Sequence, residues 1–153
     1  MKSKLFLIAS AALLMTVGAG CAATPSPSQQ ATTPANPSSV AAYEPFTLSK
    51  YQAALAAHEP IFLYFYANWC PFCREQDPRN VEVLKDFSGR VHGFRVNYND
   101  SDTDADEKAL ANTFRVTYQH TGVFFDQNGQ EIKRTIGTQS NEQLQADLKL
   151  IAL

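Results

Sequence analysis

The chain has 153 residues, of which 44% are hydrophobic and 18% are charged, and its formal net charge at pH 7 is −2. This balance is typical of a globular protein rather than a disordered one, and the length suits one domain of ordinary size. The sequence contains no block of Lys and Arg, so nothing in it favours binding to nucleic acid.

The first 20 residues carry the pattern of a secretory signal. Lys2 and Lys4 precede an apolar run over residues 5–17, and small residues then lead into Cys21. The apolar run is shorter than the ~20 residues that a membrane-spanning helix needs. The position of Cys21 resembles that of the lipidated cysteine of bacterial lipoproteins, although Gly18 stands where those signals usually have Leu. The alternative is an ordinary secretory signal.

A low-complexity segment rich in Pro, Ser and Thr follows over residues 21–42. It has too little apolar surface to offset the entropy of ordering, so we expect a disordered tether. Lipidation of Cys21 would leave two thiols in the chain and so remove the liability of an odd cysteine in an exported protein. We therefore predict a signal peptide over 1–20, a lipid-anchored tether over 21–42 and a folded domain over 43–153. The domain is expected outside the cytoplasm, either anchored on the periplasmic side of a bacterial membrane or secreted.

Residues 61–78, IFLYFYANWCPFCREQDP, are the most informative stretch. The six apolar or aromatic residues at its start predict a strand buried on both faces, as in a parallel or mixed α/β sheet. Pro71 suits the first turn of a helix, which puts Cys70 at the N-cap, where backbone N–H groups and the helix dipole favour a thiolate. Cys73 lies one turn further in, within disulfide reach, and is expected to be the more buried partner. No second pair of ligands is present to complete a structural zinc site.

The rest of the domain predicts alternating helices and strands. Helices are expected near residues 49–58, 71–88, 107–114 and 140–151, and further strands near 94–98, 122–126 and 130–136. Capping boxes are expected at Ser49 and Ser140, and Asp104 with Glu107 is expected to cap the helix between them. The acidic loop 99–106 partly resembles a calcium loop, but it lacks the glycine and glutamate that such a loop needs. His58 and His92 are interpreted as surface residues.

Residues 66–73, YANWCPFC, resemble the aromatic-Ala-x-Trp-Cys-x-x-Cys motif of the thioredoxin superfamily. Pro78 matches the proline that kinks the active-site helix of that family, and the predicted order β-α-β-α-β-β-α after the first helix is the family's order. The resemblance covers residues 43–153. It implies a thioredoxin-like α/β fold with a central mixed sheet flanked by helices. It also implies a thiol–disulfide oxidoreductase whose only redox group is the Cys70–Cys73 disulfide, with no other cofactor.

The sequence departs from the family pattern at three places. His120 stands where the family usually has a cis-proline that faces the cysteines. The sequence leaves open whether its peptide is cis or trans, and whether its side chain faces the sulfurs or points to the surface. Tyr64 replaces the buried acid that accepts a proton from the second thiol. The dipeptide Pro71-Phe72 lacks a histidine before the second cysteine, so redox direction stays open, with a reductase favoured over an oxidant.

The mechanism that the resemblance implies is thiol–disulfide exchange. Cys70, expected to be exposed, attacks a substrate disulfide, and Cys73 resolves the mixed disulfide. The residues expected to bind the substrate peptide are Trp69, Pro71, Phe72, His120 and Thr121. Expected partners are protein thiols and disulfides, together with a membrane thiol donor. Two alternatives remain: a module that holds copper or zinc with Cys70, Cys73 and His120, and an interaction scaffold that does not need Cys70.

Overall fold

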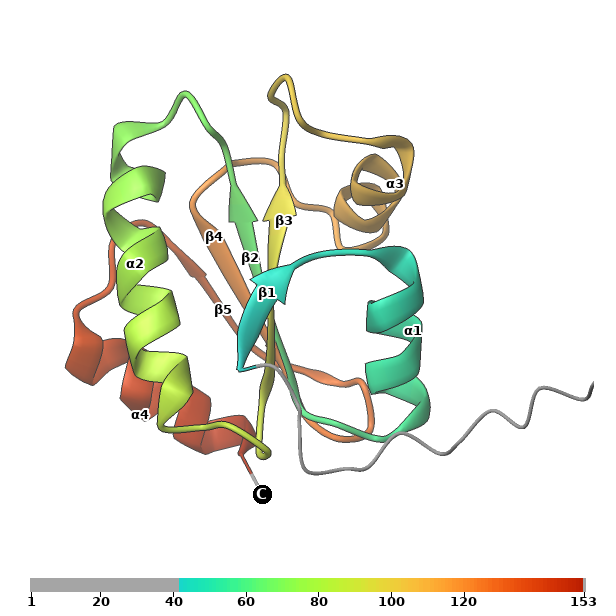
Figure 1. The fold of residues 1–153 in the computed structure, drawn as a ribbon, viewed down its shortest axis with the longest axis vertical. Coiled ribbons are helices and arrows are strands. Elements are labelled where there is room, and N and C mark those ends of the chain that lie inside the picture. The colour runs from blue at the N-terminus through green and yellow to red at the C-terminus, as the bar shows by residue number, and fades with distance from the viewer. Residues whose placement is uncertain (1–41, 153) are drawn as a thin grey trace, which may run out of the picture. The chain divides into compact units, whose positions relative to one another are not determined.

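The computed structural model describes residues 42–152, which form a five-stranded sheet with helices on both faces (Figure 1). Strand β2 (Ile61–Tyr66) lies at the centre of the sheet, and its first five residues are buried, as its apolar sequence predicts. It pairs in parallel with β3 (His92–Asn97) and antiparallel with β4 (Thr121–Phe125). The strand order is β1-β3-β2-β4-β5, in which β1 spans Tyr43–Pro45 and β5 spans Glu131–Ile136.

Four helices in this part of the chain cover the two faces of the sheet: α1 (Leu48–Ala56), α2 (Pro71–Lys85), α3 (Ala105–Thr113) and α4 (Asn141–Ile151). Helices α2 and α4 lie on one face, and α1 and α3 lie on the other (Figure 1). Successive residues of a strand point to opposite faces. Leu63 and Phe65 therefore pack in the layer beneath α1 and α3, and Phe62 and Tyr64 pack beneath α2 and α4. The predicted α/β fold with a mixed sheet, and the predicted element order, are confirmed.

Helices α3 and α4 begin at the capping boxes that the sequence predicts. The carboxylate of Asp104 accepts from the Glu107 N–H at 2.8 Å, and the Glu107 side chain accepts from the Asp104 N–H at 3.0 Å. Ser140 and Gln143 make the same reciprocal pair at the start of α4. Each of these two boxes joins residues only three positions apart, so the short sequence pattern was enough to indicate it.

Helices α1 and α2 differ from the expectation at their ends. Thr47, and not Ser49, is the N-cap of α1, because its hydroxyl accepts from the Lys50 N–H. Helix α2 contains Pro78, as predicted, but it ends at Lys85, three residues before the expected position.

The interpretation of His92 as a surface residue is wrong. Its ring is buried and stacks on Phe94 with centroids 4.2 Å apart. Both ring nitrogens lie 2.9 Å from carboxylate oxygens, Nδ1 from Glu59 and Nε2 from Glu44. Glu44 belongs to β1, a three-residue strand whose addition to the sheet edge covers His92. His58 is exposed, as expected.

The signal peptide predicted over 1–20 lies outside the described residues. The tether predicted over 21–42 also lies outside them, except for its last residue. The same holds for the predicted lipidation site, Cys21. Ala42 is the first residue described, and its carbonyl accepts from the Gly93 N–H at 3.0 Å. From there to residue 152, no helix has both the length and the apolar character needed to cross a membrane.

Candidate active site

Cys70 lies where the chain passes from β2 into α2. It is the N-cap residue, and Pro71 follows in the first turn, as the sequence predicts. The Cys70 N–H donates to the Ala67 carbonyl at 3.1 Å, and the Cys70 carbonyl accepts from the Arg74 N–H at 3.2 Å. The expectation that Cys70 is exposed is wrong, because it packs against Ala67 and Cys73 and only 4% of its surface is accessible. It nevertheless lines a surface pocket.

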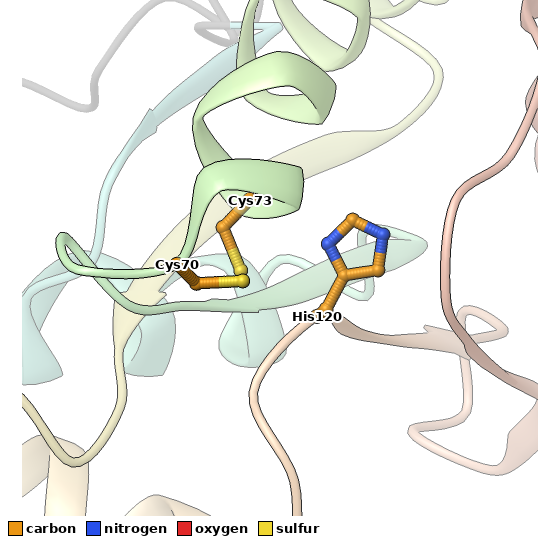
Figure 2. A group of neighbouring side chains, drawn as sticks. All are labelled: Cys70, Cys73 and His120. Carbon is orange, nitrogen blue, oxygen red and sulfur yellow. The ribbon is translucent and has the colours of Figure 1, made fainter.

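Cys73 is the more buried thiol, as predicted, with 0% of its surface accessible. Both cysteines are free thiols, and Figure 2 shows their sulfurs directed to the same point. Burial raises the pKa of Cys73 to about 11, although hydrogen bonds from the Ala67 backbone and the Tyr64 hydroxyl favour its thiolate. Cys73 is therefore protonated at neutral pH, and its attack on a disulfide needs a nearby proton acceptor.

His120 faces the two sulfurs across the end of the sheet (Figure 2). The described residues contain no cis peptide bond, so this peptide is trans, and His120 takes a left-handed backbone with φ of 62°. Its N–H donates to the Phe65 carbonyl at 2.7 Å, and its side chain is buried. The ligand atoms of Cys70, Cys73 and His120 all lie within 4.8 Å of one another. Of the two orientations left open by the sequence, the side chain takes the one toward the cysteines.

Tyr64 and His120 are direct partners. The Tyr64 hydroxyl lies 2.8 Å from His120 Nδ1, and the other ring nitrogen, Nε2, lies 3.3 Å from the Thr138 hydroxyl. Burial lowers the pKa of His120, against an opposing effect of the Glu75 charge, and burial raises the pKa of Tyr64. The pair is therefore a neutral phenol and a neutral imidazole at pH 7. Two separate departures from the family pattern thus form one hydrogen-bonded unit beside the thiols.

Exposed aromatic and aliphatic side chains surround the opening above Cys70. Phe72 is 62% exposed and lines a pocket of about 380 Å³. Tyr118 and Ile136 line the same pocket and are also exposed, and sequence reasoning missed both. Neither is near the C-x-x-C motif in the chain, so no local pattern could have found them. The residues lining the pocket are Cys70, Phe72, Tyr118, Gln119, His120, Ile136, Gly137 and Thr138.

The other residues predicted to bind substrate have different surroundings. Trp69 is 52% exposed, and its indole N–H donates to the Asn99 carbonyl at 3.1 Å, which holds the ring at the surface. Pro71 is exposed on the first turn of α2. Thr121 is buried within β4, between β2 and β5, and its hydroxyl donates to the Tyr118 carbonyl. A role for these three residues in substrate binding stays a prediction.

Two groups of side chains were candidates for binding a metal ion: the cysteines with His120, and the acidic loop that partly resembles a calcium loop. Cys70, Cys73 and His120 are the one group of three or more ligand residues found close enough together in residues 42–152. In the acidic loop, the Asp100 carboxylate instead accepts from the backbone N–H groups of Asn68 and residue 102 and from a threonine hydroxyl. The loop is thus tied to the turn before Cys70 by its own hydrogen bonds.

Comparison with known proteins agrees with this architecture. The thioredoxin-like domain family matches residues 49–152. A thioredoxin of Alicyclobacillus acidocaldarius subsp. acidocaldarius is 29% identical over 102 residues, which are 67% of this chain and 90% of that protein. The crystal structure of Trxlp from Edwardsiella tarda EIB202 has 28% identity and a TM-score of 0.55, covering 72% of this chain and 99% of that one. Oxidized thioredoxin O2 of Arabidopsis thaliana shares the fold, with a TM-score of 0.57 at 18% identity over 73% of this chain and 96% of that one. The chain therefore belongs to the thioredoxin-like family.

Proposed function

We propose that this protein is a membrane-tethered, extracytoplasmic thiol–disulfide oxidoreductase that reduces protein disulfides with Cys70 and Cys73. Membership of the thioredoxin-like family suggests this activity. The observation that carries the proposal is the placement of two free thiols one helical turn apart, with Cys70 at the N-terminus of α2 and lining the pocket. A thiolate at a helix N-terminus is favoured by the dipole and the free N–H groups.

The reaction proceeds in two exchanges. The Cys70 thiolate attacks one sulfur of the substrate disulfide, forms a mixed disulfide and releases the other substrate sulfur as a thiolate, which takes up a proton. The Cys73 thiol then loses its proton and attacks the Cys70 sulfur, which releases the second substrate thiol and leaves the Cys70–Cys73 disulfide. Two electrons pass from the cysteine pair to the substrate. A membrane thiol donor returns the pair to its reduced state.

His120 is the proposed acceptor for the Cys73 proton. Its neutral ring has one unprotonated nitrogen, and the ligand nitrogen lies within 4.8 Å of both sulfurs. Tyr64, which stands where the family has its buried acid, cannot act as a carboxylate base. It instead holds the imidazole through the 2.8 Å contact with Nδ1. Because the Tyr64 hydroxyl occupies Nδ1 and also contacts Cys73, the proposed transfer passes through it: the hydroxyl gives its proton to His120 as it takes up the proton of Cys73.

The reductase direction is supported by the surroundings of the thiols. A strongly oxidising pair is one whose reduced form is stabilised, as when neighbouring groups hold the attacking thiolate. Here the residues between the cysteines are Pro71 and Phe72, neither of which can donate a side-chain hydrogen bond to Cys70. Burial also disfavours the thiolate of Cys73. These surroundings support the proposed reductase direction, because a dithiol whose reduced form is not stabilised by its neighbours is the better reductant.

The location is proposed from the N-terminal sequence alone. Lipidation of Cys21 after removal of residues 1–20 would leave the domain on a tether over residues 21–42. Metabolic labelling with a radioactive fatty acid tests this directly. Label is expected in the wild-type chain and not in Cys21→Ser, and label in neither chain would indicate an ordinary secreted protein.

The activity is tested with the reduced full-length protein and a protein disulfide such as that of insulin. Cys70→Ser is expected to abolish reduction, and Cys73→Ser is expected to accumulate a mixed disulfide that mass spectrometry detects. The reduction potential of the pair is expected near −270 mV, and a value near −120 mV would instead identify an oxidant. A Cys70→Ser variant that keeps its cellular function would show that the fold serves as a scaffold.

A further inference from the structure

We propose that the reduced protein binds one thiophilic metal ion with a filled d shell, for which Zn²⁺ is the probe, through Cys70, Cys73 and His120. The inference goes beyond disulfide reduction and does not depend on it, because it requires only that both thiols be reduced. Thiolate and imidazole are the donors that such ions prefer over harder cations such as Mg²⁺ and Ca²⁺.

The three donors are already close to the separation that a metal ion requires. Zn–S bonds of about 2.3 Å and Zn–N bonds of about 2.0–2.1 Å put tetrahedral donors roughly 3.6–3.8 Å apart. The three ligand atoms lie within 4.8 Å of one another, and Figure 2 shows the ring directed at the sulfurs. Side-chain movements of about 1 Å would bring the three donor atoms to the separation that the metal ion requires. The backbone of all three residues is fixed by hydrogen bonds. Cys70 is the N-cap of α2, Cys73 lies in its first turn, and His120 is hydrogen-bonded to the end of β2.

The histidine is held in a tautomer that suits a metal ligand. If Tyr64 donates to Nδ1, then Nε2 carries the proton and donates to the Thr138 hydroxyl, and both observed contacts are satisfied. A ring nitrogen with a lone pair then faces the cysteine side of the site. Metal-ligating histidines characteristically donate their other N–H to such an outer partner, which fixes the orientation of the ring. The metal ion takes the place of the Tyr64 hydroxyl proton at Nδ1.

Charge and access also fit a divalent ion. Two thiolates and a neutral imidazole contribute a charge of −2, so the complex with Zn²⁺ is neutral and can lie among buried groups without an uncompensated charge. Cys70 and His120 line the pocket of about 380 Å³, which gives an ion a path from solvent. The pocket side is also where a fourth ligand, such as water, completes the coordination, as in zinc sites with three protein ligands.

Binding is coupled to the redox state by a balanced exchange. One Zn²⁺ replaces the two thiol protons, which are released to solvent, and no electron is transferred. The oxidised pair has no thiolate to offer and should not bind. The metal-loaded protein therefore cannot attack a disulfide until the ion is removed, and a chelator should restore reduction of insulin.

The test is a titration of the reduced full-length chain with Zn²⁺ against a chromogenic chelator. Cys21→Ser is included in every sample so that each thiol belongs to the Cys70–Cys73 pair. One ion per chain is expected, and none after the pair is oxidised. His120→Ala is expected to weaken binding by at least about 100-fold, since the loss of an outer partner alone costs about 10- to 100-fold. Thr138→Val should weaken it about tenfold. His58→Ala, which removes an exposed histidine, is the matched control and should change nothing.

X-ray absorption of the zinc-loaded chain provides a measurement that needs no variant at the histidine. The expected first shell has two sulfurs near 2.3 Å together with scattering from one imidazole. A shell of four sulfurs would show that two chains share the ion through their cysteines, and the proposed site would be wrong. Equal affinity in His120→Ala and the control would overturn it too, as would the absence of binding to the reduced chain. Each of these outcomes leaves the insulin assay unaffected, so the two proposals can fail separately.

Discussion

Replacing His120 with proline, the residue common in the family at this position, is predicted to destabilise this protein strongly. The backbone at His120 has φ of 62°, whereas the proline ring holds φ near −65°. Proline also lacks the N–H that donates to the Phe65 carbonyl at 2.7 Å, beside the end of the central strand. The family residue is therefore incompatible with the conformation that this chain adopts.

The expected loss in the free energy of unfolding of His120→Pro follows from these contacts. A proline that is incompatible both in φ and in its missing N–H costs about 3 kcal/mol or more. Removal of the imidazole also deprives the buried Tyr64 hydroxyl of its partner at 2.8 Å, which adds about 1–3 kcal/mol. The total of about 4–6 kcal/mol is a large fraction of the 5–15 kcal/mol that stabilises a typical domain.

Urea denaturation of the reduced protein measures this loss, and His120→Asn supplies the control. Asparagine keeps the N–H and tolerates left-handed φ, so it should lose only the contribution of the ring, about 1–3 kcal/mol. The difference between the two variants isolates the backbone contribution. If His120→Pro unfolds within about 1 kcal/mol of His120→Asn, the left-handed backbone is not required and the reasoning fails.

Three further predictions concern an exposed ring that lines the pocket, a helix cap and a carboxylate at the sheet edge. Phe72→Ser should change the free energy of unfolding by less than about 0.5 kcal/mol, because the ring is exposed. It should raise the KM for insulin about fivefold and leave a small-molecule disulfide unaffected. Equal effects on both substrates would refute an apolar docking role. Asp104→Ala removes the N-cap of α3 and should cost about 1 kcal/mol in urea denaturation; no loss would mean that the end of the helix is already frayed. Burial raises the pKa of Glu44, but hydrogen bonds from Lys50 and His92 outweigh it, and the net pKa lies below the ordinary value of 4.5. Glu44 therefore stabilises the fold above that value, and this stability is lost as the pH falls through its folded-state pKa. Glu44→Gln should accordingly be less stable than wild type at pH 7, and the difference in the free energy of unfolding should close as the pH falls below 4.5. A difference that persists at low pH would contradict this ionic origin.

Most predictions that depended on neighbouring residues in the chain were successful, although the box expected at Ser49 was wrong because Thr47 caps α1. The apolar run of β2 is buried, and α2 begins at Pro71 with Cys70 as its N-cap, as predicted. Strand burial and helix initiation depend on the types of a few neighbouring residues. The capping boxes that open α3 and α4 are of the same kind. The position of the second thiol, one turn inside the helix, follows from the spacing of the motif. Local chemistry therefore determined the fold class, the order of the elements after the first helix and the cysteine pair.

Features that depended on contacts between distant segments were missed or left open. Tyr64 and His120 are 56 positions apart, and the antiparallel pairing of β2 with β4 brings them together. The same tertiary packing places Tyr118 and Ile136 beside the pocket, and covers His92 with a strand too short to recognise in the sequence. Hydrogen bonds between strands and the exclusion of water are properties of the assembled sheet, and no short window of sequence encodes them. By itself the sequence identified the two thiols, Cys70 and Cys73, on which the proposed redox chemistry depends. Only the tertiary structure decided what surrounds the two thiols, because burial and the partner of each polar group are set by residues far apart in the chain.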